Sequence, residues 1–222
     1  MDSAIDMSSA RELVSDEALW PLVRRFLWDF ASEVHPSWIE DLDAEVEGHR
    51  LISEDLASPR VKSYILESLG VVPCFHTFPK GDWSRLLLVE GSTLVEICKW
   101  LGALVCAAPL RLVTSGAMVR ELKASLAGVY PEAFSFTAYF RLKTEGFKVE
   151  DLKVEGPKDV IGIGWQVLKS YVSGLSDPLK SRFELKLPKS YRDLQAPSFK
   201  PSTINLQLLL KLRFPEVYSL CC

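Results

Sequence analysis

Apolar residues recur at helical spacing along most of this chain. Leu19, Val23, Phe26, Leu27 and Phe30 form the first apolar stripe. Pro21 lies near its start, where proline suits a first helical turn. The same spacing predicts four further helices, over residues 61–69, 94–109, 119–129 and 161–175. Proline and glycine lie at or near their ends, which is typical of helix boundaries.

The sequence His35-Pro36-Ser37-Trp38 interrupts the first stripe. Pro36 disfavours helical backbone angles at His35. Ser37 and Glu40 have the spacing of a capping box, which would start a new helix. We expect a tight joint here, with His35 and Trp38 locking two helices together. Residues 41–58 are acidic and poor in large apolar side chains, so we expect a loop or an exposed helix.

Turn signals separate the remaining helices. Gly70 is placed to cap the end of the helix over 61–69, and residues 71–81 read as a loop. Asp82 is placed to cap a helical turn that runs to Leu88. Asp177-Pro178 is expected to start another helical turn.

Three stretches also carry a strand-like alternation. Phe147 and Val149 alternate with charged residues, and Phe183, Leu185 and Leu187 alternate briefly before Pro188. Residues 204–214 alternate too, but they are rich in leucine and poor in β-branched residues, so we favour a helix there. The predicted fold is therefore mainly α, a compact multi-helix domain with at most one or two short β segments.

The length and composition suit a single globular domain. The chain has 222 residues, 48% of them hydrophobic and 25% charged. We expect an acidic N-terminal arm over residues 1–18 and one helical domain over 19–222. Residues 1–58 hold 14 acidic and 4 basic side chains, a net of −10, whereas 59–222 hold 15 and 22, a net of +7. This asymmetry is an acidic arm that docks on a basic face, a pair of dissimilar docking faces, or a solvated surface. The overall charge of −3 disfavours general nucleic-acid binding.

Cysteine usage and hydropathy indicate a soluble protein of a reducing compartment. The five cysteines are odd in number and irregularly spaced, and Cys98 and Cys106 lie within apolar helical sequence. The acidic N-terminus is unlike a secretory signal. The longest uncharged run in the most apolar region is only 11 residues, whereas a membrane-spanning helix needs about 20.

The sequence contains two candidate ligand sites, a phosphate-binding loop and a zinc site, and the motif for each is incomplete. Gly162 and Gly164 resemble the start of a phosphate-binding loop, but Val167 stands where a dinucleotide fingerprint has its third glycine, and Trp165 would crowd a phosphate. We therefore expect these glycines to admit a neighbouring helix. Cys74 and His76 could be joined by His35 or His49 at a zinc site, but the usual paired spacing is missing.

No motif for covalent catalysis is present, and the acidic run 40–47 is explained by a solvated segment. The dicysteine Cys221-Cys222 is similar to a prenylation signal, although such tails accompany a GTP site that this sequence lacks. We predict no catalytic residue, no cofactor, no metal and no enzymatic activity.

Three stretches in order resemble one protein family. They are residues 30–42 (FASEVHPSWIEDL), residues 86–130 (from LLLVEGSTLVEICKW to ELKASLAGVY) and residues 162–188 (GIGWQVLKSYVSGLSDPLKSRFELKLP). Together they look like the SctK (YscK-type) accessory proteins of bacterial type III secretion systems. The family-motif residues are His35, Pro36, Ser37 and Trp38 in the early joint, and Leu185, Lys186, Leu187 and Pro188 at the end of the late helix. The resemblance covers about two-thirds of the chain; the acidic N-terminus, residues 41–58 and the cysteine tail depart from it.

The resemblance implies a mainly helical, non-enzymatic adaptor. Such proteins lie at the cytoplasmic, inner-membrane base of the secretion machine in Gram-negative bacteria. They join the cytoplasmic domain of the SctD-type inner-membrane ring protein to the SctQ-type pod protein, and through it indirectly to the stator and the ATPase. The implied partners include neither nucleic acid nor an inserted membrane segment. The alternatives are a secretion chaperone or effector, another helical interaction module, or a nucleotide-binding enzyme; the apolar, cysteine-containing middle argues against an effector.

Overall fold

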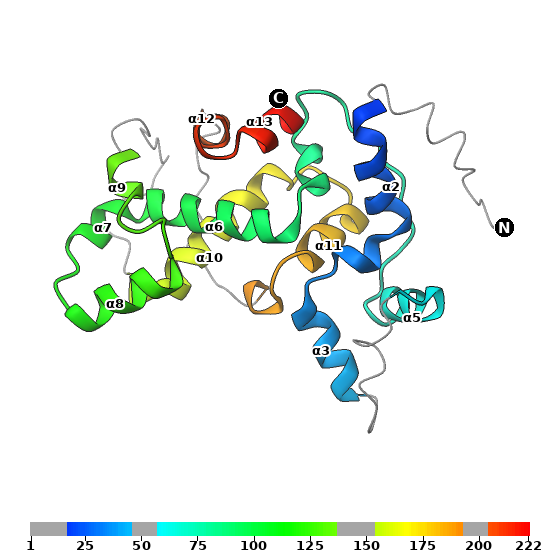
Figure 1. The fold of residues 1–222 in the computed structure, drawn as a ribbon, viewed down its shortest axis with the longest axis horizontal. Helices are drawn as coiled ribbons and strands as arrows, with labels where there is room; N and C mark the ends of the chain where they lie inside the picture. The colour runs from blue at the N-terminus through cyan, green and yellow to red at the C-terminus, as the bar shows by residue number, and fades with distance from the viewer. Residues whose placement is uncertain (1–16, 46–56, 137–153, 193–203) are drawn as a thin grey trace. The chain divides into compact units, whose positions relative to one another are not determined.

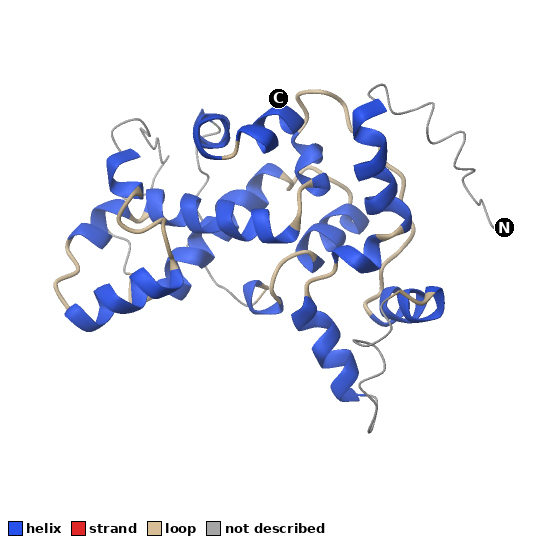
Figure 2. Cartoon of the chain, in the orientation of Figure 1, coloured by secondary structure: helices blue, strands red, loops and turns tan. Residues whose placement is uncertain are grey.

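The protein is built from helices joined by short turns. The structure, a computed structural model, describes residues 17–45, 57–136, 154–192 and 204–222, and no strand occurs among them (Figure 2). The predicted mainly α fold is confirmed. Residues 204–213 are helical, as favoured, and the brief alternation from Phe183 to Leu187 belongs mostly to the end of a helix. The strand considered around Phe147 lies outside the described residues.

The chain divides into two compact units, each made of segments that are far apart in sequence. Unit 1 contains Met1–Gly91, Leu175–Lys189 and Leu220–Cys222, and unit 2 contains Ser92–Gly174 and Ser190–Ser219. We expected a single domain over 19–222; the structure divides this stretch into the two units. Residues 1–16 of the expected arm lie outside the described part of the chain.

Unit 1 is made of short helices (Figure 1), which pack around an aromatic core. Its elements are η1 (Glu17–Leu19), α2 (Trp20–Trp28), η2 (Phe30–Glu33), α3 (Pro36–Glu45), α5 (Pro59–Ser68), η3 (Trp83–Leu88) and α11 (Asp177–Leu185), where η denotes a 3-10 helix. The Phe26 ring packs edge-on against both Phe30 and Phe78, with ring centroids 5.6 and 5.8 Å apart. Late in the sequence, α11 returns to pack against η3. Its Phe183 is fully buried, and this closes the core.

Unit 2 is organised around two long helices. Its elements are α6 (Gly91–Val105), α7 (Ala107–Arg111), α8 (Gly116–Ser125), α9 (Ala133–Phe136), α10 (Pro157–Tyr171), η5 (Lys189–Tyr191), α12 (Ile204–Arg213) and α13 (Pro215–Cys221); the first residues of α6 and η5 and the last two of α13 belong to unit 1. Both α6 and α10 bury most of their length, which explains the dense apolar spacing in the sequence. Cys98 and Cys106, which lie within this apolar helical sequence, are buried.

The helices predicted over 61–69, 119–129 and 161–175 correspond to α5, α8 and α10, and the one over 94–109 is divided between α6 and α7, with ends that differ by up to four residues. Two predicted caps are confirmed and one is wrong. Gly70 follows α5 with a positive φ of 64°, a left-handed conformation that favours glycine. Asp82 caps η3 by accepting a 2.6 Å hydrogen bond from the Ser84 backbone N–H. The predicted capping box at Ser37 and Glu40 is wrong, because α3 already begins at Pro36. Ser37 therefore lies inside the first turn, and its hydroxyl is used elsewhere.

Candidate functional site

The two sequence motifs of the resemblance meet in unit 1. The His35 backbone N–H donates to the carbonyl of Leu185 at 2.8 Å. The Trp38 indole N–H donates to the carbonyl of Leu187 at 2.9 Å. The backbone N–H of Lys189 donates to the Ser37 hydroxyl oxygen at 2.9 Å. Segments about 150 residues apart are thus joined by three hydrogen bonds, which we call the motif junction.

The His35 side chain takes the place of a helix cap at this junction. Its Nδ1 atom accepts a 3.2 Å hydrogen bond from the Ser37 backbone N–H and lies 2.9 Å from the Ser37 hydroxyl. This geometry needs an unprotonated Nδ1. Burial lowers the pKa of His35, against an opposing effect of Glu40, so the neutral ring is favoured. The joint therefore depends on a neutral histidine.

Lys186 lies at the centre of unit 1 and is fully buried. Its Nζ is 2.7 Å from a carboxylate oxygen of Glu33 and donates a 2.8 Å hydrogen bond to the carbonyl of Leu87. Glu33, itself only 7% exposed, also pairs with Arg25. Burial lowers the pKa of Lys186, and Glu33 opposes that shift. The ammonium group is held between η2, η3 and α11, so it ties these elements together.

A second buried cation, Arg182, lies one turn before Lys186 on α11. Its guanidinium donates to the carbonyl of Phe26 at 2.6 Å and lies 4.9 Å from the centroid of the Phe30 ring. Burial lowers the pKa of Arg182, while the nearby Cys74 thiol opposes this. Sequence reasoning missed both Arg182 and Glu33, since a charged residue on a short helix is usually solvated.

The remaining motif residues complete the packing. Leu185 and Leu187 are buried, as is the Trp38 ring, Pro188 is half-buried, and Pro36 is exposed at the start of α3. At the rim, Lys189 pairs with Asp41. The polar groups of the junction thus bond to one another, so its geometry suits a structural role. We expected His35 and Trp38 to lock together the two helices on either side of this joint; the hydrogen bonds instead join the start of α3 to the end of α11 and the residues that follow it.

The glycine pair in GIGWQ lies within a helix and not in a loop. α10 begins at Pro157, so Gly162 and Gly164 are already inside it. A Cβ added at Gly164 would lie 1.8 Å from the carbonyl oxygen of Cys98, and one at Gly102 would lie 1.9 Å from the carbonyl oxygen of Val160. The backbones of α6 and α10 therefore touch at this crossing. The expectation that glycine admits a neighbouring helix is confirmed for Gly164.

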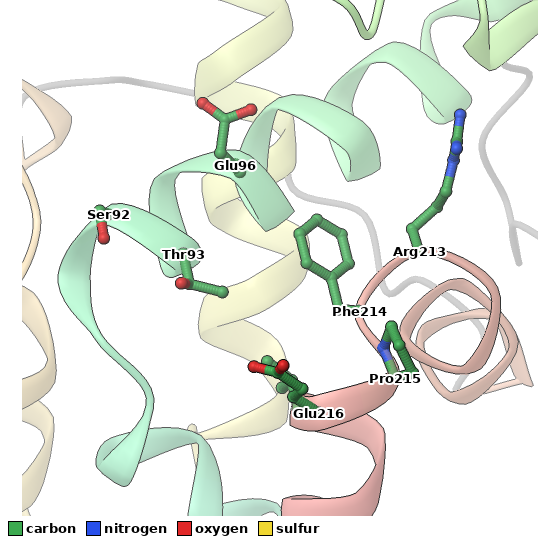
Figure 3. A pocket seen from close by; sticks show the side chains of 8 residues that line it. Ser92, Thr93, Glu96, Arg213, Phe214, Pro215 and Glu216 are labelled. Atoms are coloured by element: carbon green, nitrogen blue, oxygen red, sulfur yellow. The ribbon is translucent and has the colours of Figure 1, made fainter.

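Unit 2 also carries a surface pocket of about 450 Å³ (Figure 3). It lies between the start of α6 and the joint of α12 and α13, and is lined by Ser92, Thr93, Glu96, Arg213, Phe214, Pro215, Glu216 and Val217. Figure 3 shows the ring of Phe214 turned toward α6. The lining contains hydroxyls and carboxylates but neither histidine nor cysteine.

Two charged groups of this pocket are already engaged within unit 2. Glu96 bonds to Lys99 at 2.6 Å. Arg213 pairs with Glu132, and its guanidinium lies 4.4 Å from the centroid of the Trp100 ring and 4.7 Å from that of Phe136. Arg213 thus clamps α12 onto α6 and α9 through cation–π contacts.

The residues considered for a zinc site do not come together as a metal-binding group in the described part of the chain. Within the described ranges, no group of three or more His, Cys, Asp and Glu side chains is arranged to hold a metal ion. His49 lies outside those ranges. Cys221 is buried, and Cys222 is half-buried. In the same ranges, no helix combines the length and the apolar character needed to cross a bilayer.

The tryptophans differ in exposure. Trp38 is buried at the motif junction, Trp20 and Trp83 are half-buried, and Trp28 is 39% exposed on the outer face of α2.

Comparison with known proteins adds no relative, because no protein-family model, curated protein or solved structure matches this chain.

Proposed function

We propose that the protein is a non-enzymatic adaptor of the cytosolic sorting platform of a type III secretion system. It would join the cytoplasmic domain of the SctD-type ring protein to the SctQ-type pod protein, at the inner-membrane base of the machine in a Gram-negative bacterium. Through the pod protein it would act indirectly on the stator and the ATPase. The basis is the ordered resemblance over residues 30–42, 86–130 and 162–188.

One observation carries the proposal further than sequence alone. Two motifs of the resemblance, distant along the chain, form one hydrogen-bonded junction through Trp38 and Leu187 and through His35 and Leu185. Residue patterns that build a common structural element are more informative than isolated short motifs, because they must fit together in space. This supports treating the motifs as parts of a single family pattern.

In such an adaptor, different residues would maintain the fold and bind the partners. The motif residues are engaged with one another, so they would maintain the shape of unit 1. Partner contacts would then come from exposed faces outside the junction. The uneven charge of the chain, net −10 over residues 1–58 and +7 over 59–222, would allow two partners of different charge to bind different faces.

Binding of the full chain to each proposed partner tests this function. The purified chain is immobilised and presented separately with the SctD-type cytoplasmic domain and the SctQ-type pod protein of the same organism. We expect both to be retained, whereas retention of neither contradicts the proposal. Trp38→Ala is a useful companion variant. It should weaken unit 1 and any binding that depends on its fold, because the indole N–H bonds to the Leu187 carbonyl.

A further inference from the structure

The outer face of α2 presents two indoles with an arginine between them. Trp20, Arg24 and Trp28 follow one another at intervals of four residues, so they lie along one side of the helix. The two indole rings are in contact, with centroids 5.8 Å apart and planes inclined by 59°. Val23 and Phe26 point instead into the core of unit 1, with only 1% of each exposed. We call the outer set the Trp20–Arg24–Trp28 ridge.

The ridge is not required for the hydrophobic core, because another face of α2 supplies that contact. Trp28 is 39% exposed, although a tryptophan offers one of the largest apolar surfaces available to a protein. Tryptophan and arginine are also the side chains most enriched among the energetically dominant residues of protein interfaces. An exposed indole and a half-buried one on either side of a cation therefore have the composition of a docking surface.

The charges around the ridge indicate what would bind it. Arg25, next along the helix, pairs with Glu33 and Glu90. Asp29 pairs with Lys62 of α5 at 2.6 Å. Arg24 is exposed, and no carboxylate of the described residues pairs with it. The neighbouring charges Arg25 and Asp29 are thus neutralised within unit 1, whereas none of the described carboxylates supplies a counter-charge to Arg24.

We propose that the Trp20–Arg24–Trp28 ridge docks an acidic segment of a partner protein. A carboxylate of that segment pairs with Arg24, while apolar side chains on either side of it cover the two indoles. This inference rests on the proposed function, and the partner is one of the two proteins that the adaptor joins. An exposed guanidinium favours such a carboxylate because it can donate two parallel hydrogen bonds to it.

A lipid surface fits the ridge less well than a protein. A helix that lies in a membrane interface inserts its apolar face and carries several basic residues on its polar face. In α2 the residues with the deepest burial, Val23 and Phe26, are committed to the core.

Matched substitutions test the assignment on the full chain. Trp28→Ala removes the exposed indole, and Arg24→Glu reverses the charge of the ridge. Two control variants lie on α5 of the same unit: Tyr64→Ala, at a residue that is 42% exposed, and Arg60→Glu, at an arginine that is exposed as Arg24 is. Thermal unfolding of each variant verifies that the fold is kept.

The binding constants of the wild type and the four variants are measured with the SctD-type cytoplasmic domain, with the SctQ-type pod protein, and with vesicles of phosphatidylcholine and phosphatidylserine. We expect both ridge variants to bind one of the two proteins at least about tenfold more weakly. The α5 variants should stay within about twofold, as is usual for surface changes outside an interface. Raising the salt concentration should weaken the wild type more than Arg24→Glu.

The outcomes separate this inference from the proposed function. If the wild type binds a partner and the ridge variants bind equally well, the ridge assignment is wrong and the adaptor function stands. A loss in only one of the two ridge variants also overturns the combined assignment. Vesicle binding that is lost in Trp28→Ala overturns it in favour of a membrane contact. If the wild type binds neither protein, the adaptor proposal and the ridge assignment both fall.

Discussion

Replacing Gly164 by alanine tests the helix crossing on which unit 2 is built. The added Cβ would lie 1.8 Å from the Cys98 carbonyl oxygen, whereas real Cβ atoms essentially never approach closer than 3.0 Å, so α6 and α10 must separate locally by about 1.2 Å. A radial gap of that size forfeits a large part of the dispersion energy between the facing side chains. No side-chain rotation can relieve the contact, because the obstructing atom belongs to the backbone.

We expect Gly164→Ala to lower the free energy of unfolding by about 2–4 kcal/mol. Overpacking in an ordinary core costs about 1–3 kcal/mol. Because the obstructing atom here belongs to the backbone, we expect a cost at or above the upper end of that range. The better helix propensity of alanine offsets up to about 1 kcal/mol. Urea unfolding followed by circular dichroism gives the value by linear extrapolation.

Gly174→Ala is the matched control, because a Cβ there meets no atom within 4 Å. It should be neutral, or stabilising by less than about 1 kcal/mol. A Gly164→Ala protein as stable as the wild type would refute the close crossing. Gly164 would then not be needed for the contact between α6 and α10.

Three further predictions follow from buried or partly buried groups. Glu33→Gln leaves the buried Lys186 ammonium without its carboxylate, and should cost about 3–5 kcal/mol in urea unfolding; a loss below about 1 kcal/mol would contradict the buried pair. The lowered pKa of His35 means that the folded state binds fewer protons than the unfolded state. Stability should therefore fall as the pH drops below about 6.5, and His35→Asn should flatten that decline. An aromatic disulfide reagent should react with Cys222 long before Cys98, since Cys98 is fully buried; equal rates would contradict the burial.

The sequence predicted the local structure well wherever local rules decide it. Apolar spacing located the long helices, and Gly70 and Asp82 acted as the caps that their positions suggested. The tail over residues 204–213 is helical because leucine-rich composition outweighs a brief alternation. The error at Ser37 also has a local cause. Pro36 is compatible with the first helical turn, so the helix starts at Pro36, two residues before the Trp38 start that the capping pattern predicts.

Contacts between distant segments could not be predicted in the same way. The motif junction was visible only as two separate motifs, since nothing in a single sequence indicates that Trp38 bonds to the carbonyl of Leu187. The buried pair of Lys186 and Glu33 was missed for a similar reason, because a charged residue in isolation reads as solvated. The exposure of Trp28 likewise depends on which face of α2 the core takes.

Formation of a ternary complex tests the central claim most directly. The chain, the SctD-type cytoplasmic domain and the SctQ-type pod protein are mixed, and their assemblies are sized by chromatography with light scattering. The account predicts one complex that contains all three proteins and that does not form when the chain is left out. A ring domain and a pod protein that assemble equally well without the chain, or a chain that elutes alone from the mixture, would contradict its role as the adaptor.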